Sequence, residues 1–251
     1  MAGGFVLDDA EIFAALSKRY TRSFTFRELR RAVQALSTLY VERRKAANKA
    51  FDSDGKRAAF ALYYGTLHFL TVREVVSRLP NAIDGFEKIV DLGCGTGIAG
   101  AAWALCADCP ATLGVERDGW AVGEARWTQQ LLGLSGRVYR GDATQWRLPG
   151  SGSGVLAAYV INELDDEGRQ GLQNSLLDAA SRGATILILE PVARRVAPWW
   201  PQWAERFEDA GGRNDTWSLS LPFPDWFVDF DRATGLNHAV VKARSLFLRG
   251  K

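Results

Sequence analysis

A glycine-rich turn between a short apolar segment and a helix-forming segment constrains the fold of this chain more than any other feature of its sequence. Residues 88–92 have the apolar, β-branched character of a buried strand. Gly93, Gly95 and Gly97 follow at alternate positions, and residues 98–105 have a helical pattern. Glycines at this spacing let the backbone turn sharply off a strand and let a ligand lie against it. The sequence therefore predicts a strand-turn-helix unit with a ligand site at the turn.

Strand and helix patterns alternate along the chain as far as Pro191, which extends this unit into a repeated arrangement. Strands are predicted at residues 88–92, 112–116, 137–140, 155–161 and 184–190, and helices at residues 98–105, 120–132 and 165–182. The strand at 155–161 is almost wholly apolar, which is typical of a strand covered on both faces. These patterns predict the α/β class, with a doubly wound, mostly parallel sheet. Late strands are predicted at residues 240–241 and 245–248.

The first 85 residues have a helical pattern instead. Thr25 and Glu28 have the spacing of a capping box, and helical apolar spacing continues to Tyr40. A second helix is predicted from Phe60 towards Leu79, before a proline that ends it. We therefore predict an N-terminal helical cap at residues 1–85 and a Rossmann-like ligand-binding domain at residues 86–251.

The bulk composition is that of an ordinary globular protein. Hydrophobic residues make up 47% of the 251 residues, and no apolar run approaches the roughly 20 residues that span a bilayer. The N-terminus lacks the basic and apolar regions of a secretory signal. The three cysteines are too few for a disulfide framework, and the lone pair Cys106 and Cys109 predicts no metal site. We therefore expect a cytoplasmic protein with no membrane partner.

The glycine turn satisfies two ligand patterns, which the neighbouring charge separates. Gly95, Gly97 and Gly100 match the G-x-G-x-x-G pattern of dinucleotide sites. Residues 91–97 match D-x-G-x-G-x-G and closely resemble the cofactor motif of the class I methyltransferases. The carboxylate of Asp91 repels a pyrophosphate but attracts the sulfonium and ammonium groups of S-adenosyl-L-methionine. The charge favours S-adenosyl-L-methionine as the cofactor.

The resemblance to class I methyltransferases implies a seven-stranded sheet, methyl transfer, and cofactor contacts along the strand ends. Glu116 suits hydrogen bonds to a ribose diol, and Asp142 resembles the acidic residue that meets the adenine amino group in that class. Alternatively, these carboxylates cap turns or lie in solvent. The predicted cofactor-binding residues are Tyr64, Asp91, Gly93, Cys94, Gly95, Gly97, Glu116, Arg117, Asp142, Ala143 and Asn162.

The end of the fourth predicted strand lies on the acceptor side. Ligands bind outside the carboxyl ends of strands in open α/β sheets, so Asn162 and Glu163 should face the methyl group. Asn162 either orients the acceptor or caps the next helix. Where an acceptor must lose a proton, the candidate bases are Glu163, Asp165, His68 and His238, although each histidine could instead be structural or surface-exposed. The predicted catalytic residues are Asn162, Glu163 and His68.

Two further regions bear on the acceptor. Tryptophans crowd the last third of the chain, where they either wall an acceptor pocket or fill the core: Trp199, Trp200, Trp203, Trp217 and Trp226. Basic residues gather near the N-terminus, where they either meet phosphates or form a solvated helix face: Lys18, Arg19, Arg22, Arg27, Arg30, Arg31, Arg43, Arg44, Lys45, Lys49, Lys56 and Arg57. We predict methyl transfer to an oxygen or nitrogen of a small molecule between the helical cap and the Trp-rich tail.

A second, more local resemblance bears on the partner. Residues 61–67, residues 162–164, and residues 225–230 with His238 and Lys242 resemble the methyltransferase-like proteins associated with the mitochondrial small ribosomal subunit, and their bacterial relatives. No cysteine follows Cys109, so the metal-binding cysteines of that family have no counterpart here. The resemblance implies RNA or the small ribosomal subunit as an alternative partner, in a ribosomal-RNA methyltransferase or a non-catalytic assembly factor. The sequence predicts no oligomeric state.

Overall fold

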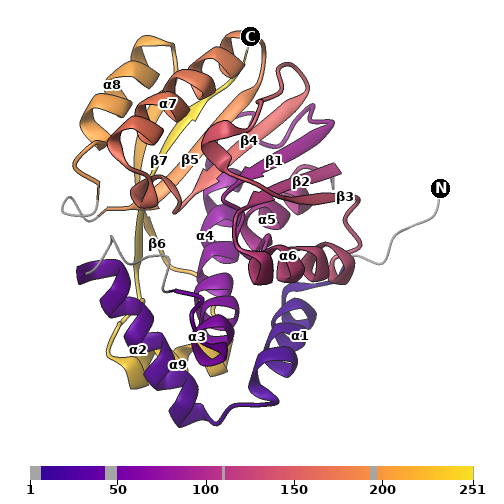
Figure 1. The fold of residues 1–251 in the computed structure, drawn as a ribbon, viewed down its shortest axis with the longest axis vertical. Coiled ribbons are helices and arrows are strands. Elements are labelled where there is room, and N and C mark those ends of the chain that lie inside the picture. Colours follow the sequence, from indigo (N-terminus) through magenta and orange to yellow (C-terminus); the bar gives the residue numbers. More distant parts are fainter. Residues whose placement is uncertain (1–6, 43–49, 109–110, 193–196, 251) are drawn as a thin grey trace.

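A computed structural model describes residues 7–42, 50–108, 111–192 and 197–250. Its centre is one seven-stranded sheet with the order β3-β2-β1-β4-β5-β7-β6 (Figure 1). The strands are β1 Lys88–Leu92, β2 Ala111–Glu116, β3 Gly136–Arg140, β4 Ser153–Ala158, β5 Thr185–Pro191, β6 Arg213–Leu219 and β7 Val241–Leu248. Strands β1 to β5 pair in parallel, whereas β7 is antiparallel to both of its neighbours. The predicted doubly wound, mostly parallel sheet is confirmed.

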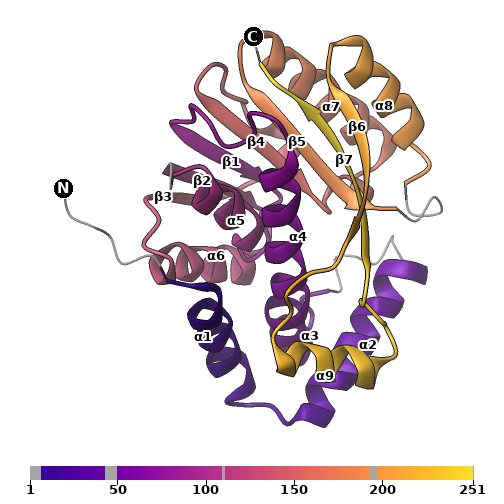
Figure 2. The same ribbon diagram turned by 180° about the vertical axis from the view of Figure 1, so that it is seen from behind.

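Helices cover both faces of the sheet, as Figures 1 and 2 show. One face carries α4 Gly65–Arg78, α5 Ile98–Cys106 and α6 Gly119–Leu131, and the other carries α7 Asp166–Ser181 and α8 Trp200–Asp209. Successive residues of a strand point to opposite faces, so Ile89 packs in the core on the α4 and α5 side and Val90 in the core on the α7 and α8 side. Two buried faces explain why the strands are continuously apolar.

The N-terminal region is helical, as predicted, and lies below the sheet in Figure 1. It contains α1 Asp9–Thr21, α2 Phe26–Glu42, α3 Asp54–Ala59 and η2 Phe60–Tyr64, a π-helical turn that runs directly into α4. The predicted capping box precedes α2: the Glu28 backbone N–H donates to Thr25 Oγ1 (3.3 Å) and the Thr25 backbone N–H donates to Glu28 Oε2 (2.8 Å). None of the helices in the described part of the chain is long and apolar enough to cross a membrane.

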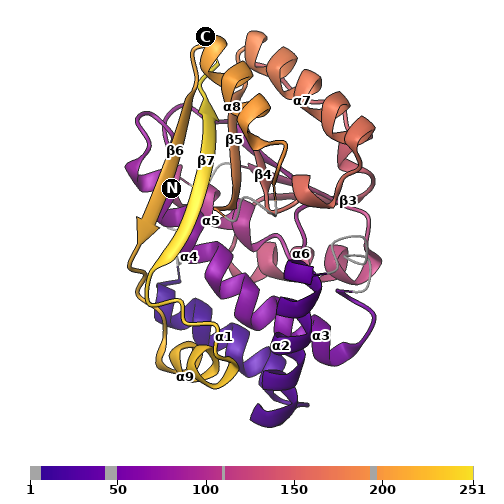
Figure 3. The same cartoon turned by 90° about the vertical axis from the view of Figure 1, so that its left-hand side faces the viewer.

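The C-terminal tail connects the sheet to the cap. Strands β6 and β7 extend away from the sheet, and α9 Asp225–Thr234 between them lies beside α2 (Figures 1 and 3). Phe230 of α9 stacks on Phe26 of α2, with ring centroids 4.3 Å apart. Neither β6 nor α9 was predicted, and β6 is a polar edge strand without regular apolar alternation. The single strand β7 was predicted as two strands. The division at residue 85 stays a prediction.

Candidate active site

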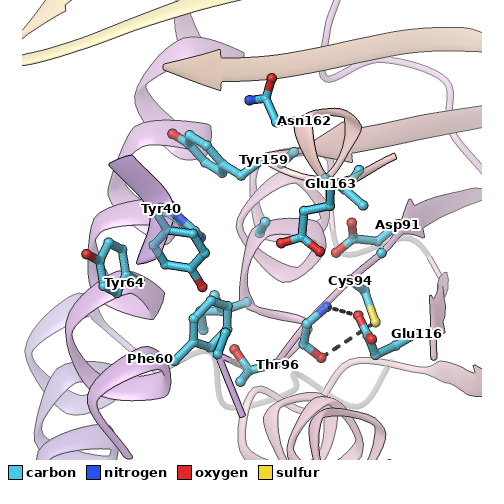
Figure 4. A pocket seen from close by; sticks show the side chains of 18 of the residues that line it. Tyr40, Phe60, Tyr64, Asp91, Cys94, Thr96, Glu116, Tyr159, Asn162 and Glu163 are labelled. Carbon is cyan, nitrogen blue, oxygen red and sulfur yellow. Dashed lines mark hydrogen bonds between the residues drawn. The ribbon is translucent and has the colours of Figure 1, made fainter. Parts of the chain in front are cut away.

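A cavity of about 730 Å³ lies between the strand ends and the helical cap. We call its strand-end half the floor, lined by Asp91, Gly93, Cys94, Gly95, Glu116, Arg117, Asp142, Ala143, Asn162, Glu163 and Glu190. The other half is formed by the cap and the tail, and we call it the roof. It is lined by Ser37, Tyr40, Phe51, Phe60, Tyr64, Leu67, His68, Leu236, His238, Val241 and Lys242. Figure 4 shows the acidic side chains of the floor on one side of the cavity and the aromatic rings on the other.

The glycine turn shapes the floor through its backbone. Gly93, Gly95 and Gly97 have φ angles of +63°, +52° and +73°, which residues with a side chain rarely adopt. A Cβ on Gly93 would lie 2.3 Å from Cγ2 of Val160, so no side chain fits there. Gly93 and Gly95 line the cavity, whereas Gly97 is the N-cap of α5 and is absent from the lining residues. The role of Gly97 is therefore to turn the chain.

Asp91 at the end of β1 is buried beneath this turn. Its Oδ2 accepts a hydrogen bond of 2.9 Å from the backbone N–H of Gly100. A Cβ on Gly100 would lie 2.7 Å from the same oxygen, so this glycine makes room for the carboxylate. Burial raises the pKa of Asp91 to about 7, and the charge of Glu116 adds to the rise. Asp91 therefore both braces the turn and supplies a carboxyl group to the floor.

Glu116 ends β2 and Asp142 follows β3 on the same floor. Glu116 Oε2 accepts from the backbone N–H of Gly95 (3.0 Å) and Oε1 from that of Asp118 (2.8 Å), which leaves a lone pair on each oxygen for a ligand. Asp142 Oδ1 accepts from the hydroxyl and the backbone N–H of Thr144, at 2.8 Å each. These hydrogen bonds lower the pKa of Asp142 and keep it ionised, while its Oδ2 remains for a donor.

Asn162 connects the ends of β4 and β5. Its side-chain amide donates to the carboxylate of Glu190, and its Oδ1 accepts a bond of 3.0 Å from Nε1 of Trp199. Both polar ends of Asn162 are therefore engaged, although the residue lines the cavity as predicted. Glu190 was not predicted as a site residue. It is completely buried, and this burial raises its pKa to about 8. A carboxylate at the end of an apolar strand, just before Pro191, is the signal that could have identified it.

Glu163 ends a short 3-10 turn, η4 Ile161–Glu163, and forms an ion pair of 3.3 Å with Arg117. Its side chain is 30% exposed and points towards the same space as Asp91 (Figure 4). Burial in the cavity raises the pKa of Glu163 to about 7, against the opposing effect of Arg117. Asp165 instead caps α7 through Gly168 and is absent from the cavity lining. Glu163 is thus the only one of these two candidate bases that reaches the cavity.

His68 stacks on Tyr159, with ring centroids 4.0 Å apart and an interplanar angle of 14°. Burial lowers the pKa of His68 to about 3, so its imidazole remains neutral and accepts a proton only weakly. Tyr159 itself has a φ of +60°, a strained conformation for a non-glycine residue. The predicted catalytic His68 does lie in the roof, but its surroundings suit packing against an aromatic ring better than proton transfer.

The roof is mainly aromatic. The rings of Tyr40 and Tyr64 meet edge to face at 5.3 Å, and those of Phe51 and Phe60 do so at 4.8 Å. Phe60 and Tyr64 begin and end the π-helical turn η2, a departure from α-helix that frequently occurs at functional sites. The roof thus offers flat apolar surfaces opposite the acidic floor.

The tryptophans of the tail are absent from the lining of this cavity and lie in the core, which is one of the two alternatives predicted for them. Trp199, Trp200 and Trp203 are buried in the core that α8 shares with the sheet. Trp217 and Trp226 pack against the core on the other side of the sheet. Their large apolar area is removed from water there, which is the core-filling alternative. The tail contributes Leu236, His238, Val241 and Lys242 to the roof instead.

Several of the basic N-terminal residues that the structure describes form ion pairs with acidic side chains. Arg19 forms an ion pair of 2.8 Å with Glu124 and lies over the ring of Trp127. Lys56 pairs with Asp52, and Arg57 pairs with Asp54. Four of the predicted basic residues lie outside the described residues, as does the second cysteine of the C-x-x-C pair: Arg43, Arg44, Lys45, Lys49 and Cys109.

Searches with the sequence found no matching family model and no matching curated protein. Solved structures do match. A magnesium protoporphyrin IX methyltransferase from Synechocystis PCC 6803 has a TM-score of 0.54 at 16% identity, covering 83% of this chain and 98% of that one. The mitomycin 7-O-methyltransferase has a TM-score of 0.52 at 16% identity, covering 97% of this chain and 74% of that one. A methyltransferase from Aquifex aeolicus has a TM-score of 0.50 at 14% identity, covering 74% of this chain and 92% of that one. The chain therefore has the fold of the class I S-adenosylmethionine-dependent methyltransferases.

Proposed function

We propose that this protein is an S-adenosylmethionine-dependent methyltransferase that methylates an oxygen or nitrogen of a small aromatic molecule. The observation that carries the proposal is the row of carboxylates at successive strand ends. Asp91 and Glu116 lie at the ends of β1 and β2, Asp142 follows β3, and all three line one cavity together with the glycine turn. A row of negative charge suits a cationic cofactor and opposes a pyrophosphate.

The residues of the floor match the chemical groups of the cofactor. The free lone pairs of Glu116 suit a ribose diol, and Oδ2 of Asp142 suits the adenine amino group. Asp91 and Glu163 supply negative charge for the ammonium and sulfonium groups. S-adenosylmethionine, when bound, supplies an activated methyl group, so the protein mainly has to align the acceptor with it.

The roof supports a small aromatic acceptor. The cavity of about 730 Å³ is within the range of small-molecule sites, roughly 300–1,000 Å³, and must hold cofactor and acceptor together. The aromatic rings of Tyr40, Phe51 and Phe60 offer flat surfaces to such a molecule. Two of the similar structures are named as methyltransferases of small ring compounds, mitomycin and magnesium protoporphyrin IX.

Isothermal titration calorimetry with S-adenosylmethionine and S-adenosylhomocysteine tests the proposal. We expect both to bind the wild-type protein, and Glu116→Gln and Asp91→Asn to weaken binding roughly 10- to 100-fold, since each removes a charge-assisted contact. Asp166→Asn, at an exposed position on α7, is the matched control and should leave binding unchanged. Undiminished binding in both floor variants, or tight binding of a nicotinamide dinucleotide, would overturn the proposed site.

Measurements of RNA binding test the alternative acceptor, ribosomal RNA. Arg30 and Arg31 lie on α2 outside the floor. If the protein bound ribosomal RNA with a steep salt dependence, and charge reversal at Arg30, Arg31, Arg43 and Arg44 abolished that binding, the ribosomal alternative would replace the small-molecule acceptor. We expect only weak RNA binding that these changes scarcely alter.

A further inference from the structure

We propose that His238, oriented by Asp231, is the general base that takes the proton from a hydroxyl group of the aromatic acceptor. This inference rests on the proposed methyl transfer and assigns a chemical role to a residue of the roof. His238 follows α9 and lines the cavity opposite the strand ends. It is one of only two histidines in the chain, so the assignment can be tested with little ambiguity.

Two residues of the tail and one residue from a distant part of the sequence form a hydrogen-bonded cluster at this point. Nδ1 of His238 lies 2.6 Å from Oδ1 of Asp231, and the backbone N–H of His238 donates to Oδ2 at 2.6 Å. The hydroxyl of Tyr63, from η2, also donates to Oδ1 and lies 3.0 Å from Nδ1. Both oxygens of the Asp231 carboxylate therefore contact His238, which fixes the orientation of the imidazole ring.

The cluster also determines which ring nitrogen carries the proton. Burial alone would raise the pKa of Asp231, but the hydrogen bonds from Tyr63 and His238 outweigh it and lower the pKa. An ionised carboxylate only accepts hydrogen bonds, so the proton of the neutral imidazole lies on Nδ1. Within the described part of the chain, no side chain forms a hydrogen bond with Nε2 of His238. The unprotonated Nε2 is then the ring nitrogen left for a ligand in the cavity that His238 lines.

The comparison with His68 favours His238 as the base. His68 lies in the same roof, but it stacks on Tyr159 and burial disfavours its protonated form. His238 has a carboxylate against Nδ1, which stabilises the imidazolium that forms on proton transfer. The hydroxyl of Tyr63 lies within hydrogen-bond distance of His238, and Lys242 and Glu190 line the same cavity.

The proposed step conserves atoms and charge. The acceptor oxygen forms a bond to the methyl carbon of S-adenosylmethionine while the carbon–sulfur bond breaks, and that electron pair remains on sulfur. The proton of the acceptor hydroxyl moves to Nε2 of His238. The positive charge of the sulfonium thus ends on an imidazolium that Asp231 neutralises. A phenol, with a pKa of about 10, needs such a base near neutral pH.

Nuclear magnetic resonance of the ring nitrogens tests the geometry without any turnover. The protein is labelled with ¹⁵N-histidine, and the signals missing from the His238→Asn variant identify His238. We expect the ring to carry its proton on Nδ1 and none on Nε2 at about pH 8. A proton on Nε2 under these conditions would overturn the proposal.

Transfer of labelled methyl groups to two phenols tests the chemistry. The His238→Asn variant can still donate to Asp231 through its amide, which preserves the structural contact while removing the base. With catechol we expect the rate to fall roughly 100-fold or more. With 4-nitrophenol, which ionises far more readily, the loss should be much smaller. Equal losses with both phenols would indicate a structural role and overturn the assignment, as would transfer by the variant at the wild-type rate.

Cofactor calorimetry separates this inference from the proposed function. We expect His238→Asn to bind S-adenosylmethionine as the wild type does, because His238 belongs to the roof. Failure of the wild-type protein to bind S-adenosylmethionine would refute the methyltransferase proposal itself. Normal cofactor binding without methyl transfer to either phenol would refute only the phenolic acceptor and the base assigned to it.

Discussion

The floor and the roof of the cavity are built in different ways. The floor consists of residues at or just after the ends of strands in one sheet, and hydrogen bonds hold them, such as those from Gly95 to Glu116 and from Thr144 to Asp142. The roof combines helices of the N-terminal cap with the segment after α9, which the tail carries across to α2 (Figure 3). The floor is therefore built on the strands of one sheet, and the roof depends on the association of distant segments.

This difference assigns the two ligands of the proposed reaction to the two halves. The floor is acidic and matches a cationic cofactor, whereas the roof is aromatic and carries the Asp231–His238 pair. Changes in the floor should thus abolish cofactor binding, and changes in the roof should alter methyl transfer while the cofactor still binds.

The largest effect is expected at the glycine turn. Gly93→Ala places a Cβ against Val160 at a positive φ, so we expect a loss of about 2–4 kcal/mol in the free energy of unfolding and no measurable cofactor binding. Denaturant unfolding and calorimetry measure both effects. Gly123→Ala, on α6 where a Cβ meets nothing within 4 Å, is the control and should gain up to about 1 kcal/mol. Normal cofactor binding by Gly93→Ala would show that the turn does not contact it.

The next effect is a pH dependence of the floor. Burial raises the pKa values of Asp91 and Glu163 to about 7 and that of Glu190 to about 8. A cationic ligand favours the ionised carboxylates, so its affinity should rise from about pH 6 to pH 8, roughly tenfold for each group that must ionise. Calorimetry in buffers of different ionisation enthalpy should detect the released protons. Affinity that does not change over this range would contradict a cation in the floor.

The unliganded protein should show the opposite trend in stability. These folded-state pKa values lie above the unfolded values of about 4, so the folded state binds more protons and its stability falls as the pH rises towards 7–8. We expect a lower Tm at pH 8 than at pH 5.5 without cofactor, and a smaller difference with it. The Asp91→Asn variant should reduce this slope, and an unchanged slope would exclude Asp91 as its source.

A smaller effect on cofactor affinity is expected from the roof. Tyr40→Ala removes a ring that lines the cavity and contacts Tyr64. We expect cofactor affinity within about threefold of the wild type, since the floor is intact, together with weaker binding of catechol. Calorimetry with each ligand separates the two results. A tenfold loss of cofactor affinity would instead extend the cofactor site to the cap, where Tyr64 was predicted to bind it.

The smallest effect is expected at the exposed ion pair of the floor. The Arg117 side chain is 60% exposed where it meets Glu163. We expect Arg117→Gln to change the free energy of unfolding by less than about 1 kcal/mol, because solvent screens such pairs. Cofactor affinity should change by at most about threefold. A larger loss, insensitive to salt, would show that Arg117 contacts the cofactor directly.

Most of the floor could be predicted because its signals are contiguous in the sequence. Asp91, Gly93 and Glu116 stand immediately at the ends of apolar segments, and the carboxyl ends of parallel strands meet at one edge of the sheet. Glu190 occupies the same kind of position at the end of β5 and was not predicted. The alternatives that stayed open concern the tail, where the tryptophans have no periodicity that distinguishes a pocket wall from a core.

The sequence by itself determined the alternation of strands and helices, the glycine turn, and the carboxylates that follow the strands, since all of these depend on neighbouring residues. Only the tertiary structure decided which side chains form the roof. Tyr63 and Asp231 are 168 residues apart and meet because α9 packs against the cap. The association of β6 and β7 with the sheet carries α9 to that position, and burial of apolar surface between distant helices holds it there. No local pattern records such a contact, so only the folded chain distinguished His238 from the other candidate bases.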